Sequence, residues 1–184
     1  MRACLLSVLL LASLSVSEKS LAFQFGSGPN LLTNPSFENG LENWTVDDQN
    51  KVDWIVDYGF PPPNDHGLGA AVLFADGQIS QCVFVFSDTL YTTAIWAFGG
   101  CADSSTLVRI DWYADGSCST LAASDFTTIA SESDTWKLTS RLIQSTSNAQ
   151  SAQFQVVRTG ACKEAIILDN AEFSDQIFGS TFEE

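Results

Sequence analysis

The sequence predicts an all-β protein, an antiparallel β-sandwich built as one domain. Apolar residues alternate with polar ones through most of the chain, and no segment has the spacing of an amphipathic helix. Turn-forming pairs such as Asp76-Gly77, Gly99-Gly100 and Asp115-Gly116 separate these alternating runs, which recur about every ten to fifteen residues. The chain has 184 residues, enough to bury one core of this kind.

The expected strands share an alternating pattern that ends at a turn residue. They cover residues 30–33, 52–56, 70–74, 78–86, 90–98, 107–113, 136–144, 152–158 and 165–173. Pro61-Pro62-Pro63 interrupts the series. Because proline cannot donate a hydrogen bond to a sheet, we expect an exposed loop there.

The first 22 residues have the pattern of a secretory signal peptide. Arg2 precedes an apolar run from Ala3 to Leu14, and Ser20-Leu21-Ala22 offers small residues for cleavage. The run is too short for a transmembrane helix, and no later run could span a bilayer. We therefore expect a secreted, extracellular monomer with no membrane insertion, a domain over residues 23–174 and a C-terminal tail over 175–184.

The formal net charge is −14. A surface this acidic repels nucleic acid and anionic membranes, so neither is an expected partner. The charge is compatible with a neutral glycan, with calcium, or with a solvated acidic surface.

Cysteine usage agrees with export. Cys4 lies in the signal peptide, which leaves Cys82, Cys101, Cys118 and Cys162 for two disulfides with three possible connectivities. The sequence has one histidine and no Cys-x-x-Cys pair, so a zinc site is not expected.

Strand directions favour one disulfide pairing. Counted along the expected strands, the loop with Cys101 lies at one end of the sandwich, and the loops with Cys118 and Cys162 lie at the other. A disulfide needs Cα atoms within about 7 Å, which favours Cys118–Cys162 and leaves Cys82–Cys101. The main alternative is Cys82–Cys118, and Cys101–Cys118 would need a loop that folds back along a strand.

Two segments near the ends of the chain carry a recognisable pattern. The matching residues are Asn30, Leu31, Asn34, Phe37, Glu38, Gly40, Leu41 and Trp44, then Leu168, Asp169, Asn170 and Ala171. Together they resemble the opening and closing strands of the CenC-type carbohydrate-binding modules. The resemblance implies a jelly roll of the galactose-binding-domain-like type, with Trp44 and Trp136 in its core.

The same resemblance implies a structural calcium ion. In those modules the residues matching Glu38 and Asp169 hold calcium together with backbone carbonyls, the oxygen ligands that this ion takes. Alternation places Asp169 on one strand face with Ile167 and Ala171, pointing inward, where an unpaired carboxylate is costly. The alternative is that both carboxylates accept hydrogen bonds from turn N–H groups.

Alternation also sorts the central strands into two faces. Val108, Ile110 and Trp112 are expected inside, whereas the resemblance places Trp96 outside. If these strands are neighbours in one sheet, a shared outer face presents an aromatic ring among planar polar groups, a mixture that suits sugars. The candidate ligand-binding residues on and beside this face are Trp54, Tyr58, Trp96, Arg109, Asp111, Tyr113, Gln153 and Gln155.

These observations predict a secreted, non-catalytic carbohydrate-binding protein whose partner is a polysaccharide or glycan. The alternative is a stand-alone surface or matrix adhesion protein without a sugar site. A small polysaccharide hydrolase is the third hypothesis, because a glycosidase needs only two suitably spaced carboxylates. The chain has no Gly-x-Ser-x-Gly motif, and His66 has no evident nucleophile partner, so an enzyme is not expected.

Overall fold

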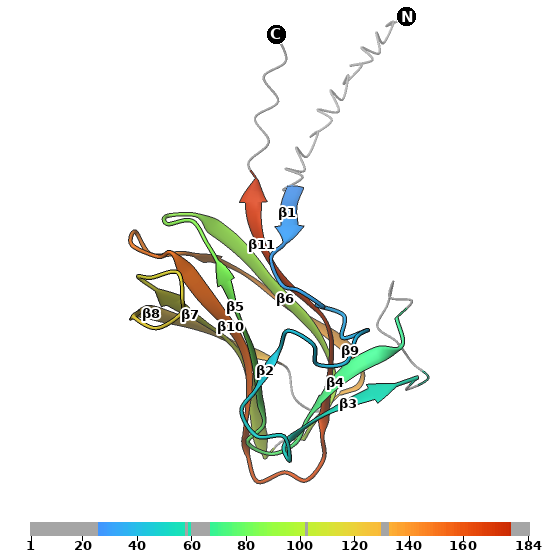
Figure 1. The fold of residues 1–184 in the computed structure, drawn as a ribbon. Coiled ribbons are helices and arrows are strands. Elements are labelled where there is room, and N and C mark those ends of the chain that lie inside the picture. Colours follow the sequence, from blue (N-terminus) through green and yellow to red (C-terminus); the bar gives the residue numbers. More distant parts are fainter. Residues whose placement is uncertain (1–25, 58, 60–66, 102, 130–132, 178–184) are drawn as a thin grey trace, which may run out of the picture.

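Two antiparallel β-sheets form the protein in the computed structural model (Figure 1). The structure describes residues 26–57, 59, 67–101, 103–129 and 133–177. Sheet A has six strands, in the order β3 (Val52–Val56), β4 (Gly69–Leu73), β11 (Ile166–Ile177), β6 (Leu90–Gly99) and β9 (Ser133–Gln144), with β1 (Gly26–Asn30) paired to β11. Sheet B has five, in the order β2 (Thr45–Val46), β5 (Gln78–Phe84), β10 (Ser151–Gly160), β7 (Ser104–Tyr113) and β8 (Leu121–Ile129). The predicted all-β antiparallel sandwich is confirmed.

A cluster of aromatic side chains fills the space between the sheets. Tyr91, Trp112, Phe154 and Phe173 are fully buried and come from two strands of each sheet. The ring of Phe173 lies 5.0 Å from that of Tyr91, 6.1 Å from Trp112 and 6.3 Å from Phe154. Aromatic pairs at these separations attract one another beyond the area they bury, so this cluster joins the two layers.

The segment between β1 and β2 fixes the start of the domain to its last strand. Phe37 is fully buried, and its ring lies 5.1 Å from that of Trp44. The indole N–H of Trp44 donates to the carbonyl of Asn34 (3.0 Å), which holds the segment in a compact turn. The N–H of Ala171 in β11 donates to the carbonyl of Pro35 (2.9 Å). The residues that carry the resemblance therefore make contacts that close the fold.

The ends of the domain differ from the prediction. Residues 26–30 form β1, and β11 continues to Ile177, so the first residues assigned to the tail belong to the sheet. A Cβ at Gly28 would overlap the carboxylate of Asp175, so this close pairing requires a glycine. The signal peptide over 1–22 and the rest of the tail lie outside the described residues. Among the residues that the structure describes, no helix could cross a membrane.

Two further predictions about buried groups were wrong. Trp136 is half-buried rather than in the core, and its ring lies 5.7 Å from that of Phe98 on the outer face of sheet A. Asp169 and Ala171 do not share a face, because a β-bulge lies between Asp169 and Glu172 and breaks the alternation of β11.

The disulfides also differ from the favoured pairing. The bonds are Cys82–Cys118, with Cα atoms 6.2 Å apart, and Cys101–Cys162, with Cα atoms 6.5 Å apart. The favoured pairing failed because the strand count omitted β8. One extra strand between the two loops moves Cys162 to the end of the sandwich that holds Cys101.

Candidate functional site

The outer face of sheet B carries polar side chains from four adjacent strands. β5, β10, β7 and β8 lie side by side, and every second residue of each points to this face. One row across the strands contains Cys82, Gln153, Asp111 and Ser124, and the next contains Ser80, Gln155, Arg109 and Phe126. The intervening residues Val108, Ile110 and Trp112 of β7 are buried in the core, as predicted.

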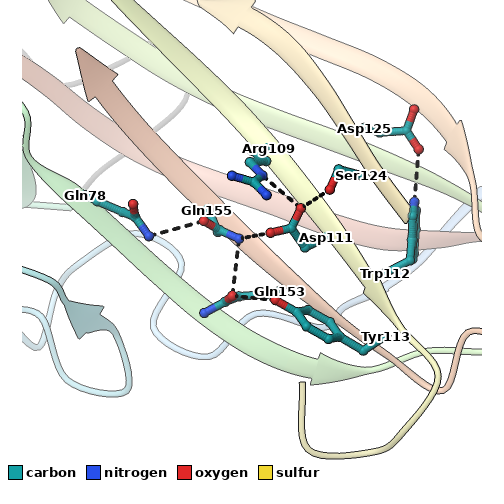
Figure 2. Close-up of polar contacts among 9 residues, drawn as sticks. All are labelled: Gln78, Arg109, Asp111, Trp112, Tyr113, Ser124, Asp125, Gln153 and Gln155. Atoms are coloured by element: carbon teal, nitrogen blue, oxygen red, sulfur yellow. Dashed lines mark hydrogen bonds and ion pairs between the residues drawn. The ribbon is translucent and has the colours of Figure 1, made fainter. Parts of the chain in front are cut away.

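Asp111 is the centre of a hydrogen-bond network on this face (Figure 2). Its side chain is buried, with a carboxylate that accepts from Arg109 Nε (2.8 Å), Gln155 Nε2 (2.7 Å) and Ser124 Oγ. The three donors come from β7, β10 and β8. Because a buried carboxylate is costly without such partners, each donor is held in one orientation by the charge it compensates.

The network continues toward β5 through the side-chain amides of β10 (Figure 2). Gln155 Oε1 accepts from Gln78 Nε2 (3.2 Å), and Gln155 Nε2 also donates to Gln153 Oε1 (3.2 Å). Tyr113 Oη donates to the same oxygen of Gln153 (3.1 Å). Burial raises the pKa of Tyr113, and the negative charge of Asp111 adds to this effect, so the phenol stays protonated and keeps its donor.

Arg109 is the charged group of this face that is open to a ligand. Its side chain is 43% exposed, and within the described residues only its Nε donates a hydrogen bond to the protein. The N–H groups of the two terminal nitrogens can therefore donate to a ligand. A planar guanidinium held in this way can donate two parallel hydrogen bonds to a pair of oxygen atoms on a bound molecule.

The loop of residues 114–120 borders one end of this face. The disulfide Cys82–Cys118 ties the loop across β10 to β5. Ser151 on β10 reinforces the tie, because its hydroxyl accepts from the Cys118 N–H (3.2 Å) and donates to the carbonyl of Asp115 (2.6 Å). The border is therefore fixed to the sheet by one covalent bond and two hydrogen bonds.

The side chain of Asp115 organises the interior of that loop. It accepts hydrogen bonds from the hydroxyl and N–H of Ser117 (both 2.8 Å) and from the N–H of Thr120 (2.6 Å). These hydrogen bonds hold the pKa of the Asp115 carboxyl far below its usual range. The loop shape is thus set by an ionised carboxylate with several donors.

Exposed aromatic rings lie at both margins of the polar face. Phe126 on β8 stands directly across from Arg109 and is 64% exposed. Phe84 on β5 stands across from Ser151 and is 76% exposed. These exposed rings beside fixed polar groups make the face a candidate binding surface.

The predicted ligand-binding residues separate into two groups. Arg109, Asp111, Tyr113, Gln153 and Gln155 come together on sheet B, which confirms their common face. The other predicted residues do not belong to it.

Trp96 is correctly expected to point outward, but it belongs to β6 in sheet A, so its place beside Arg109 was wrong. Trp54 also lies in sheet A, where it packs against the core and donates its N–H to the Phe37 carbonyl (2.7 Å). Tyr58 lies outside the described residues.

Other residues of this face were not among the predicted ligand-binding residues. Ser124 and Phe126 lie on β8, which was not expected as a strand. Gln78 was placed on a strand but not on the face. Gln78 pairs with Val157, which lies two residues from Gln155 on β10, and this register places Gln78 on the same face as Gln155.

Glu38 and Asp169 occupy different environments. Glu38 is exposed, and its two oxygens accept from the N–H groups of Leu68 and Gly69 (both 3.1 Å). Asp169 is fully buried and accepts from the N–H of Asn170 (2.6 Å). Both carboxylates therefore accept backbone N–H groups, as the alternative in the sequence analysis expected. A carboxylate oxygen that accepts one hydrogen bond can still coordinate an ion, so the oxygen donors of these two residues are compatible with calcium.

No protein-family model and no curated protein matches the chain. Solved structures match its fold. The module TmCBM61, determined with β-1,4-galactotriose, matches with a TM-score of 0.59 at 20% identity, covering 81% of this chain and 100% of that chain. A family 16 carbohydrate-binding module matches with a TM-score of 0.60 at 17% identity, covering 78% and 99%.

The enzymatically active domain of bacteriophage CBA120 tailspike protein 4 matches with a TM-score of 0.65 at 17% identity. The match covers 79% of this chain, which spans about a fifth of the tailspike chain, since 21% of the latter is covered. At these identities the likeness shows the fold, a β-sandwich that carbohydrate-binding modules share.

Proposed function

We propose that the protein is a secreted, non-catalytic carbohydrate-binding protein that holds a polysaccharide on the outer face of sheet B. The observation that carries the proposal is the prearranged polar network around Asp111, which leaves the Arg109 fork exposed beside the ring of Phe126. The fork can donate to neighbouring hydroxyls, while the C–H face of a sugar packs on the ring. The carbohydrate-binding modules that share the fold support this class of ligand.

The composition of the face favours binding without catalysis. Among the described strand residues on this face, Asp111 supplies the one carboxylate. A glycosidase needs two carboxyl groups on either side of the scissile bond, one of them able to donate a proton. The carboxylate oxygens of Asp111 instead accept hydrogen bonds from three protein donors. The net charge of −14 favours a neutral glycan over an acidic one.

The proposal includes export and a structural calcium ion. Two disulfides favour an oxidising compartment outside the cytoplasm. Glu38 and Asp169 would hold the ion, because Glu38 lies on the segment that hydrogen-bonds β11 two residues beyond Asp169. A bound calcium ion would supply positive charge to the buried Asp169 and fix the two ends of the domain together.

Binding to a panel of immobilised polysaccharides that includes galactan and xylan tests the proposal. We expect retention on at least one of them, and Arg109→Ala should weaken it by about 1.5–3 kcal/mol, the range for hydrogen bonds from a charged donor. Lys137→Ala is the matched control, because it removes one positive charge from β9 in sheet A. Equal retention of both variants, or no retention of the wild-type protein, would reject the proposed face.

A further inference from the structure

We infer that the outer face of sheet A carries a second carbohydrate-binding groove, built around Trp96, and that the protein binds two glycan chains at once. The ligand class rests on the proposed function of sheet B. The groove has a volume of about 550 Å³ and crosses β9, β6 and β11 to β1 and the segment that follows it. Its lining includes Trp96, Leu138, Ser140, Asn170 and Glu172.

The indole N–H of Trp96 distinguishes this side chain from other tryptophans of the protein. The N–H groups of Trp44, Trp54 and Trp112 donate to Asn34, Phe37 and Asp125, at 3.0, 2.7 and 2.9 Å. The half-buried Trp96 makes no such bond within the described part of the chain. Because tryptophan N–H groups away from bulk water usually have an acceptor, this donor is available to a molecule in the groove.

A small residue forms the floor of the groove, and polar side chains stand on both sides of it. Ala94 on β6 pairs with Ser140 of β9 on one side and with Glu172 of β11 on the other. The hydroxyl of Ser140 is exposed. Glu172 Oε1 accepts from Ser174 Oγ (2.7 Å), which orients the carboxylate and leaves its second oxygen without a partner among the described residues.

This combination matches a neutral polyhydroxyl compound. The ring of Trp96 offers a flat apolar surface, its N–H is a donor, and the Glu172 oxygen is a strong acceptor for hydroxyl groups. A negative carboxylate on a chain of net charge −14 disfavours an anionic polymer. The volume lies within the range of about 300–1,000 Å³ typical of small-ligand sites.

The two sites lie on opposite faces of the sandwich, since one is on the outer side of sheet A and the other on the outer side of sheet B. Two sites raise retention on one chain only where geometry allows both to bind it. Opposite faces favour two separate chains instead. The protein would therefore cross-link polysaccharides.

Two measurements test the inference. One is the agglutination of beads coated with galactan and, separately, of beads coated with xylan. The other is calorimetry, which gives the number of the corresponding oligosaccharides bound per protein chain. The wild-type protein should agglutinate beads and bind two oligosaccharides per chain. Trp96→Ala, and independently Ala94→Leu, which fills the groove floor, should each reduce the stoichiometry to one and abolish agglutination without loss of bead binding. Leu142→Ala, an exposed residue on the same face but outside the groove, should behave as the wild type.

The outcomes separate the two proposals. A wild-type stoichiometry of one that stays at one in Trp96→Ala, or unchanged agglutination by both groove variants, overturns the second site and leaves the sheet B site intact. Binding that survives Arg109→Ala but not Trp96→Ala rejects the sheet B site instead. If agglutination stops because Trp96→Ala converts a dimer to a monomer in sedimentation, with oligosaccharide stoichiometry per chain unchanged, the groove is a contact between copies and the inference is wrong.

Discussion

Replacing Asp111 by asparagine tests whether the polar network organises the outer face of sheet B. The change keeps the size of the side chain but turns one carboxylate oxygen into an NH₂ group. Asp111 accepts three hydrogen bonds, two through Oδ1 and one through Oδ2. An asparagine oxygen can serve only one of these two positions, and its nitrogen is a donor. At least one native donor must then face another donor.

The structure gives the size of the expected effect. If the asparagine oxygen faces Arg109 and Ser124, its nitrogen faces Gln155 Nε2, which donates over 2.7 Å in the native protein. Rotating the Gln155 amide would remove this conflict but break its bond from Gln78. Hydrogen bonds to charged groups contribute about 1.5–3 kcal/mol, and an unsatisfied buried donor costs about 1–3 kcal/mol. We expect the free energy of unfolding to fall by about 2–4 kcal/mol.

Urea unfolding followed by tryptophan fluorescence measures this change, and a Tm lower by roughly 4–16 °C should accompany it in a chain of this size. Ser124→Ala is the matched control, because it removes one donor and leaves the carboxylate with two. It should cost about 0.5–1.5 kcal/mol. If the asparagine variant is no less stable than this control and binds glycan as the wild type does, the network does not organise the face.

Three further predictions follow from buried and ionised groups. Trp112→Ala should lower the free energy of unfolding by about 3–5 kcal/mol. Replacing the exposed Phe126 by alanine should change the free energy of unfolding by no more than about 0.5 kcal/mol. Equal losses for the two variants in urea titrations would contradict the assigned faces. Because the pKa of Asp115 is lowered in the folded state, its carboxylate stabilises the fold at pH values above the ordinary pKa of 3.8, and this stabilisation is lost as the pH falls toward the folded-state pKa. The Tm difference between wild type and Asp115→Asn should therefore shrink only below about pH 4. A Tm difference that is already absent at pH 6 would refute this prediction. A chelator should lower the Tm by removing calcium, because calcium at a hundredfold excess over its Kd stabilises the folded protein by about 2.7 kcal/mol. In Asp169→Ala the chelator should have no effect on the Tm. Identical melting curves of the wild-type protein with and without chelator would exclude the ion.

The sequence was informative about single strands because the pleat repeats every two residues within one strand. On β7, alternation correctly separated buried Ile110 and Trp112 from Arg109 and Asp111 on the outer face. On β6, the resemblance to the CenC-type modules placed Trp96 outside, and the structure agrees. These assignments need no knowledge of the partner strands, so they could be made from the sequence.

Which strands share a sheet depends on contacts between residues far apart in the sequence, and alternation carries no information about them. Trp96 and Arg109 lie on consecutive strands of the chain, yet β6 pairs with β11 and β9 while β7 pairs with β10 and β8. The chain crosses from one sheet to the other between β6 and β7. The predicted face required these strands to be neighbours in one sheet, so it combined residues of two opposite surfaces and did not reveal the separate groove at Trp96.

β8 escaped prediction because two polar residues interrupt its inward apolar positions, Ala123 and Ile129. Asp125 points inward, where it accepts the indole N–H of Trp112 (2.9 Å), and Thr127 follows it on the same side. A strand at the edge of a sheet needs little apolar surface, so its polar inward positions hid the pattern. The omission had a consequence far from β8, because strand directions alternate along the chain and one missing strand reverses the end assigned to every later loop. The inferred position of Cys162 was reversed in this way, and restoring β8 places it beside Cys101.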